Sequence, residues 1–259
     1  MSDVADLTEF LKRHICLYAS FDQGVDADIS RGDRTATYEP SVVQWDSDAG
    51  RNGGALAFSA ADYGWAEDEF AYSAAANFPY SEDGFSGTIS LWLNGDPDTD
   101  LSPEYPVDPF HISRRAADAS FYLDLTRPND DRYGSPRKLR FGFYNDSPAN
   151  DRFANGQLIV IGELNWRRGE WHHVAATWRN ANSGSDDGAA AVYVDGVRRG
   201  WMEGYEHRLT WNVDELTIGL GQRYAGMIDD VLILDAELGP RQIEELAALT
   251  APGLAQYCR

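Results

Sequence analysis

The sequence predicts an all-β fold, an antiparallel sandwich or barrel with one short helix near each end. Three observations support this prediction. Between residues 55 and 234, apolar and polar residues alternate in short runs that turn-forming residues separate. Helical periodicity is confined to the two ends of the chain. The 259 residues are 43% hydrophobic, enough to bury one substantial core.

The N-terminal end is predicted to form a short packing helix. Val4, Leu7, Phe10 and Leu11 fall on one face at helical spacing. Asp3 can cap the helix, and the basic residues 12–14 lie at the negative end of its dipole. We expect residues 1–14 to be a helical lead-in to a single domain, residues 15–259, because no repeat, low-complexity tract or linker divides the rest.

The β domain follows this helix directly. Residues 15–21 predict a strand, and residues 22–52, rich in Asp, Gly, Ser and Arg, predict a long loop with one short strand at 42–45. Ten alternating runs come next, at residues 55–58, 87–94, 110–113, 120–125, 138–144, 158–161, 171–178, 189–194, 216–219 and 225–234. Short strands at such spacing indicate an antiparallel sandwich or barrel rather than an α/β fold.

Two local signals mark the C-terminal third. Asp195-Gly196 follows the run 192–194 and accepts the positive φ angles of a two-residue hairpin turn. Pro240 fits the first position of a helix, Gln242 can reach back to its cap, and Leu238 can pack onto Ile243. A short helix over residues 240–249 therefore closes the domain.

The charge balance excludes two classes of partner. Lys and Arg number 22 against 42 Asp and Glu, a net charge of −20, and such a surface repels phosphate backbones and anionic lipids. We expect no nucleic-acid partner. No apolar run approaches the roughly 18 residues of a membrane span, so we also expect no membrane insertion.

The location of the protein stays open at this stage. The first 14 residues lack the basic start and apolar block of a signal peptide, which fits a mature or trimmed chain, an intracellular protein, or one released by another route. We favour an extracellular or surface-exposed protein, for example on a virion, over a cytoplasmic one. Cys16 and Cys258 exclude a disulfide-dense scaffold and could form one bridge or stay free thiols.

Three stretches form a recognisable pattern: GEWHHVAATW at 169–178, VYVDG at 192–196 and GMIDDVLILD at 226–235. Together they resemble the laminin-G-like branch of the concanavalin A-like lectin and glucanase superfamily. The resemblance spans about residues 18–249 and is most specific in the last third. It implies a two-sheet antiparallel jelly-roll sandwich, with one sheet concave. It implies no single function, since lectins, hydrolases, lyases and adhesive domains share this fold.

Alternation within the strands predicts which side chains point away from the core. Core positions such as Ile89, Leu91 and Leu93 leave Trp92 on the opposite face, and five strands obey the same rule. If these strands share one sheet, one open surface carries the predicted ligand-binding residues Trp92, His111, Tyr122, Asp124, Arg140, Tyr144 and His173. Aromatic rings stack on the C–H faces of sugars, and planar polar groups bond their hydroxyls. The alternative is an ordinary solvated sheet face.

We therefore expect a lectin-like carbohydrate-binding domain that recognises a glycan on its concave sheet. The first alternative is a polysaccharide lyase acting by β-elimination, with His111, Tyr122, Arg140 and His173 as candidate catalytic residues. The carboxylate motif E-x-D-x-x-E of the superfamily's retaining glycoside hydrolases is absent. The second alternative is an assembly or decoration protein of a virion or cell surface, with a protein partner.

The resemblance also implies a structural Ca²⁺ ion between the first and last strands of the sandwich. Asp22 and Asp229 occupy the matching places as metal ligands. The alternative is that Asp229 only accepts hydrogen bonds from loop amides. The acidic run Asp96, Asp98 and Asp100 starts like a calcium-binding loop, but it lacks that loop's glycine and its final glutamate, so we expect a solvated turn there.

Overall fold

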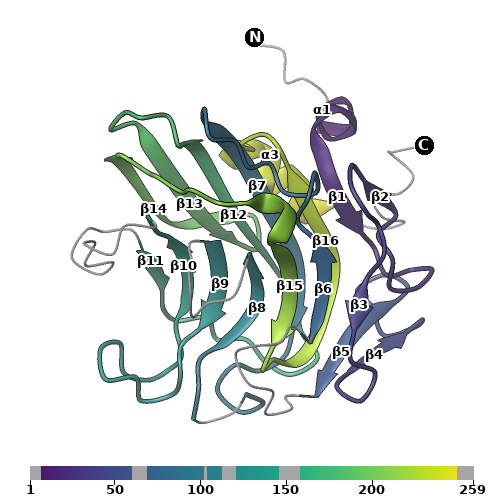
Figure 1. Cartoon of the computed structure of the whole chain (residues 1–259). Helices are drawn as coiled ribbons and strands as arrows, with labels where there is room; N and C mark the ends of the chain where they lie inside the picture. Colours follow the sequence, from purple (N-terminus) through teal and green to yellow (C-terminus); the bar gives the residue numbers. More distant parts are fainter. Residues whose placement is uncertain (1–6, 60–68, 102–103, 113–120, 146–157, 250–259) are drawn as a thin grey trace.

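Two antiparallel sheets stacked face to face form the body of the protein (Figure 1). The computed structural model describes residues 7–59, 69–101, 104–112, 121–145 and 158–249. The predicted all-β sandwich with short N- and C-terminal helices is confirmed. The helices are α1 (Leu7–His14) and α3 (Pro240–Ala248), and one 3-10 turn, η1 (Val213–Glu215), precedes β15.

The larger sheet contains nine strands. Seven of them lie in the order β14 (Val197–Tyr205), β13 (Gly188–Val194), β12 (Trp171–Ala181), β7 (Phe85–Asn94), β16 (Ala225–Leu234), β1 (Ile15–Ala19) and β2 (Ile29–Ser30). The other two are β5 (Ala55–Ser59), which pairs with β16, and β4 (Val43–Asp46), which pairs with β5. The first and last segments of the domain thus meet where β1 pairs with β16.

The smaller sheet contains seven strands, in the order β11 (Leu158–Ile161), β10 (Leu139–Phe143), β9 (Phe121–Leu125), β8 (Val107–Ile112), β15 (Thr217–Gln222), β6 (Phe70–Ser73) and β3 (Thr37–Tyr38). The core lies between the two sheets. The Phe121 and Trp178 rings from opposite sheets meet edge to face at 4.9 Å, and Phe78 stacks on Trp178 at 5.6 Å. Aromatic contacts of this kind add to the burial of apolar area.

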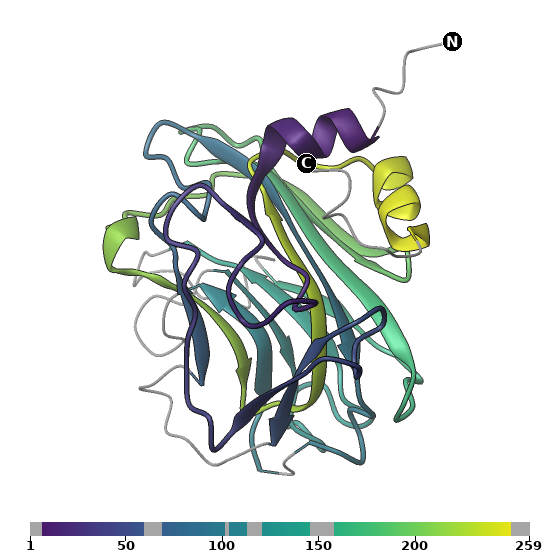
Figure 2. The ribbon, with the colours of Figure 1, turned by 90° about the vertical axis from the view of Figure 1, so that its right-hand side faces the viewer.

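Helices α1 and α3 lie on the outer side of the nine-stranded sheet (Figure 2). Leu7 and Leu11 of α1 and Ile243 and Leu246 of α3 form a second apolar cluster with outward-facing strand residues such as Tyr193. Pro240 begins α3 as predicted, and the Gln242 side chain accepts a hydrogen bond from the Gly239 amide at 2.9 Å. No helix among the described residues is long and apolar enough to cross a membrane.

Most predicted strands and the hairpin are confirmed. The turn residues Asp195 and Gly196 both have positive φ angles, 51° and 79°, and join β13 to β14. The sequence analysis missed β14, β6 and the short β2 and β3. Cys16 is a buried free thiol, and Cys258 lies outside the described residues. The division of the chain at residue 14 stays a prediction.

Candidate functional site

The seven predicted ligand-binding residues do not share one surface. The strands β8, β9 and β10 place His111, Tyr122, Asp124, Arg140 and Tyr144 on the outer side of the seven-stranded sheet. Trp92 of β7 and His173 of β12 face outward from the other sheet, on the far side of the core. The prediction of a single surface was wrong because alternation distinguishes inward from outward, not one sheet from the other.

The outer face of the seven-stranded sheet is also not open. His111, Tyr122, Asp124, Arg140 and Tyr144 are each at most 7% exposed. These five residues form a buried polar layer on the sheet, which we call the polar layer below. A ligand that binds at this face therefore contacts the residues around the polar layer, because the five residues of the layer are not accessible.

An ion pair is the centre of the polar layer. Arg140 and Asp124 are cross-strand partners on β10 and β9. Arg140 Nε donates to Asp124 Oδ1 at 2.7 Å, and Arg140 Nη2 donates to Asp124 Oδ2. This bidentate geometry holds the guanidinium in one plane and in one orientation.

Two glycines let aromatic rings lie close to the sheet. A Cβ at Gly142 would clash with the Tyr122 ring, and one at Gly219 would clash with His111. The Tyr122 and Tyr144 hydroxyls bond each other at 2.8 Å. Burial raises the pKa of Tyr144, so its hydroxyl stays protonated at neutral pH.

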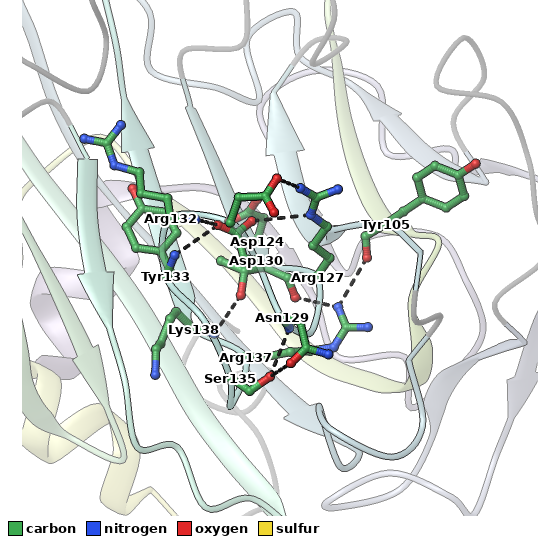
Figure 3. A network of polar contacts seen from close by, with 12 residues as sticks. Tyr105, Asp124, Arg127, Asn129, Asp130, Arg132, Tyr133, Ser135, Arg137 and Lys138 are labelled. Atoms are coloured by element: carbon green, nitrogen blue, oxygen red, sulfur yellow. Dashed lines mark hydrogen bonds and ion pairs between the residues drawn. The ribbon is translucent and has the colours of Figure 1, made fainter.

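Residues 127–136 connect β9 to β10 and fold into a compact loop (Figure 3). The Asp130 carboxylate accepts the backbone amides of Arg132 and Tyr133 at 3.0 and 3.1 Å, and the Ser135 hydroxyl accepts the Asn129 amide at 2.9 Å. The half-buried Tyr133 ring lies 5.6 Å from the Arg140 guanidinium. The loop thus places an accessible ring above the central ion pair.

A second ring and guanidinium pair borders the same end of the sheet. Tyr105 precedes β8 and is 37% exposed, and the Arg223 guanidinium lies 4.2 Å from its ring centroid. In the view of Figure 3, Asp124, Arg127 and Asp130 lie between the Tyr133 and Tyr105 rings. Beside Arg223, burial raises the pKa of Glu69 to about 7, and one Glu69 oxygen accepts the Arg223 amide at 2.9 Å.

Arg137 joins the two segments that carry these rings. Its backbone amide donates to the Asp98 carboxylate at 2.9 Å. Its side-chain Nη1 donates to the carbonyls of Tyr105 and Thr126, at 3.2 and 2.5 Å. The side chain is 1% exposed, and burial lowers the pKa of Arg137 to about 10.

The outward residues of the nine-stranded sheet form a different cluster. The Arg51 guanidinium lies 3.8 Å from the Trp92 ring centroid, and the His173 ring lies 5.2 Å from Trp92. His173 Nε2 bonds the Ser90 hydroxyl at 2.8 Å. Burial lowers the pKa of His173 to about 4, so the ring is neutral at physiological pH. These contacts fill the neighbourhood of Trp92 with the chain's own side chains.

The predicted calcium ligands lie beside this cluster, near the pairing of β1 with β16. Asp22 accepts the Gly54 amide at 3.3 Å. Both Asp229 oxygens accept backbone amides, from Arg51 and Asp230, at 2.8 and 2.7 Å. Burial and the charges of Asp230 and Asp22 raise the pKa of Asp229 above the usual range of a carboxyl group. Within the described residues, no group of three or more acidic, His or Cys side chains could hold a metal ion.

Sequence reasoning missed Tyr105, Tyr133, Arg223 and Glu69. Tyr105 and Tyr133 lie in two connections between strands, the first between β7 and β8 and the second between β9 and β10. One signal could have found them, because aromatic residues in the loops of a rigid β scaffold are frequent binding residues. Arg223 and Glu69 follow and precede short strands and carry no comparable signal.

Comparison with known proteins identifies the class. The family model of the concanavalin A-like lectin/glucanases superfamily matches residues 67–244, and the chain belongs to this superfamily. No curated protein is a significant match to the sequence.

The fold is also similar to solved structures. Domain 4 of AbnA, an extracellular arabinanase from Geobacillus stearothermophilus in complex with arabinotriose, is 18% identical, with a TM-score of 0.55 over 90% of this chain and 98% of that one. The binding domain of Paraclostridial Mosquitocidal Protein 1 is 16% identical, with a TM-score of 0.58 over 92% of this chain. The botulinum neurotoxin serotype D domain in complex with N-acetylneuraminic acid is 10% identical, with a TM-score of 0.56 over 93%. This chain spans about half of each toxin domain, 52%.

Proposed function

We propose that the protein is a carbohydrate-binding domain that holds a glycan against the outer face of the seven-stranded sheet. The observation that carries this proposal is the arrangement of two accessible tyrosine rings, Tyr105 and Tyr133, at one end of that face. Each ring lies beside a guanidinium, and the Asp124–Arg140 pair lies beneath one of them. Rings that stack on sugar C–H faces, flanked by planar hydrogen-bonding groups, suit a saccharide.

The buried polar layer has a supporting part in this proposal. Asp124 holds the Arg140 guanidinium in place beneath the Tyr133 ring. The buried side chains of Tyr122, Tyr144 and His111 stiffen the sheet below the ligand. Pre-ordered side chains bind more tightly because less conformational entropy is lost. The solved structures with arabinotriose and N-acetylneuraminic acid lend support to a saccharide as the ligand class.

A glycan array that includes arabinan fragments and sialylated glycans tests the proposal. We expect the intact chain to bind at least one glycan, and the double variant Tyr105→Ala/Tyr133→Ala to lose about tenfold or more in affinity. Tyr38→Ala is the matched control, since Tyr38 is 41% exposed on β3 at the distant edge of the same sheet. The absence of any bound glycan, or full binding by the double variant, would overturn the proposal.

Cleavage of a polysaccharide by β-elimination is the second candidate. One observation favours it: His111 and Tyr122 are directly paired across β8 and β9, on the same face as Arg140. The fourth candidate residue, His173, lies on the other sheet. A panel of uronans monitored for the ultraviolet absorbance of unsaturated ends decides the question, and absorbance that does not rise with any substrate removes this candidate.

We also propose that Ca²⁺ binds between Asp22 and Asp229. The support is the crowding of carboxylates at this point: the charges of Asp230 and Asp22 raise the pKa of the buried Asp229, and the charges of Asp22 and Asp28 raise the pKa of Asp230. A divalent cation relieves such repulsion, and Ca²⁺ accepts carbonyl and water oxygens as its remaining ligands. A protein partner in a surface assembly, and an extracellular location, stay predictions.

A further inference from the structure

An exposed tryptophan lies on the face opposite to the proposed glycan site. Trp201 of β14 is 61% exposed, and the Arg198 guanidinium lies 4.7 Å from its ring centroid. Burial of a large apolar side chain stabilises a protein, and this exposed ring forgoes most of that stabilisation. β14 is an edge strand of the nine-stranded sheet, so the ring is displayed at its rim.

A β-bulge brings these two side chains together. Gly200 pairs with Val192 and Arg198 pairs with Tyr193, which leaves Arg199 as an extra residue without a partner on β13. In a regular strand, residues 198 and 201 would point to opposite faces. The extra residue restores Arg198 to the face of Trp201, next to the outward-facing Ala191 and Tyr193. Bulges that re-aim a side chain in this way are frequent at functional sites.

The bulges also indicate how a ligand can be recognised here. β14 has a second extra residue, Gly204, so only residues 200–203 form a regular stretch. A twice-bulged edge is a poor template for adding a strand from another chain. Recognition at this rim therefore falls to side chains, and one ring with one guanidinium is the size of a sugar residue rather than of a protein interface of roughly 800 Å² per partner.

The charges around Trp201 select the kind of sugar. Arg179 shares this face and pairs with Glu237 at 3.3 Å and with Glu203 at 3.8 Å. Arg198 makes no ion pair with any residue that the structure describes. A guanidinium without a carboxylate, beside an exposed ring, complements a pyranose that carries its own carboxylate.

We propose that Trp201 and Arg198 form a second saccharide site, separate from the seven-stranded sheet, that binds a carboxylate-bearing sugar such as a uronic acid. The sugar stacks on Trp201, and its carboxylate accepts hydrogen bonds from Arg198. Arg179, held by two glutamates, borders the site and orients the hydroxyls.

Titration calorimetry with oligogalacturonate and with neutral oligogalactose, at physiological salt, tests this site on the intact chain. We expect Trp201→Ala to weaken oligogalacturonate binding roughly tenfold or more and Trp201→Phe to retain part of the affinity. Arg198→Gln should weaken oligogalacturonate by a similar factor and leave the neutral sugar unchanged. Arg241→Gln, which removes an exposed arginine on α3, is the control for lost charge.

Two further comparisons separate this site from the first one. Tyr105→Ala/Tyr133→Ala should leave binding at Trp201 intact, so the two proposals fail independently. Thermal unfolding of Trp201→Ala should match the intact chain, because the ring is exposed. Equal binding of oligogalacturonate by Trp201→Ala and the intact chain, or no binding by either, would overturn the second site.

Discussion

Apolar helix side chains cover part of the outer face of the nine-stranded sheet, whereas the outer face of the seven-stranded sheet carries paired polar groups. Ile243 and Leu246 of α3 complete a continuous apolar cluster on the first face. On the second face, Asp124, Arg140, Tyr122 and Tyr144 satisfy one another by hydrogen bonds. Both of these regions are buried, but only the one on the seven-stranded sheet places hydrogen-bonding groups beneath the proposed glycan site.

Loss of the ion pair in the polar layer is expected to have the largest effect on stability. Asp124→Leu leaves the 7% exposed Arg140 without its carboxylate, and loss of one partner of a buried pair costs roughly 3–5 kcal/mol. Urea unfolding measures this loss. The double variant Asp124→Leu/Arg140→Met should recover most of it, and a double variant less stable than the single one would contradict the interpretation.

Loss of an apolar contact between α3 and the nine-stranded sheet should lower the free energy of unfolding somewhat less. Ile243→Ala removes a fully buried side chain from the contact between α3 and the sheet, at a cost of about 3 kcal/mol. Glu244→Ala on the exposed side of the same helix is the control and should change stability by less than about 0.5 kcal/mol. Glycan binding at Tyr105 and Tyr133 should persist in the folded Ile243→Ala chain. Loss of binding would contradict the view that the two faces act independently.

Ca²⁺ binding is expected to stabilise the nine-stranded sheet alone, because the proposed calcium site lies on that sheet. At a free concentration one hundred times its dissociation constant, an ion that binds only the folded state adds about 2.7 kcal/mol. Differential scanning fluorimetry with Ca²⁺ and with a chelator should show this as a raised Tm. Asp229→Asn should abolish the response and Asp48→Asn, an exposed loop carboxylate, should keep it. If Ca²⁺ raises the Tm of both variants equally, the ion binds at another site.

The last effect is absent at neutral pH, develops only on acidification, and concerns the core between the two sheets. His207 stacks on Phe143 at 3.8 Å, and burial lowers its pKa from 6.5 to about 3. The unfolded chain therefore takes up a proton between these pH values while the folded chain does not. Stability from this residue is complete above pH 6.5 and falls by about 1.4 kcal/mol per pH unit on acidification. His207→Phe should flatten the stability profile from pH 6.5 toward pH 4, and an unchanged slope would contradict this.

The sequence predicted the sandwich well because its core follows a local rule. In β7, Ile89, Leu91 and Leu93 are all fully buried in the core, as the alternation predicts. β14 was missed for the opposite reason. Its apolar residues are interrupted by the two extra residues, Arg199 and Gly204, so the alternation is broken twice within nine residues.

The candidate site could be predicted only in part. The pairing of Asp124 with Arg140 follows from adjacent strands, but the assignment of Trp92 and His173 to another sheet depends on strand order, which the alternation of side chains does not contain. Tyr133 reaches Arg140 only because Asp130 holds the amides that close its loop. Such contacts depend on loop geometry, which no periodicity encodes.

Arg137 links two connections of the domain that a redesign would otherwise treat separately. Its acceptors come from residues 98 and 105, in the connection between β7 and β8, and from residue 126, which directly follows β9. Transplanting the loop between β9 and β10 together with Arg137, but without the segment that carries Tyr105, would leave the buried guanidinium without one of its carbonyl acceptors. The two connections are thus a single module, to be exchanged together when new specificities are engineered.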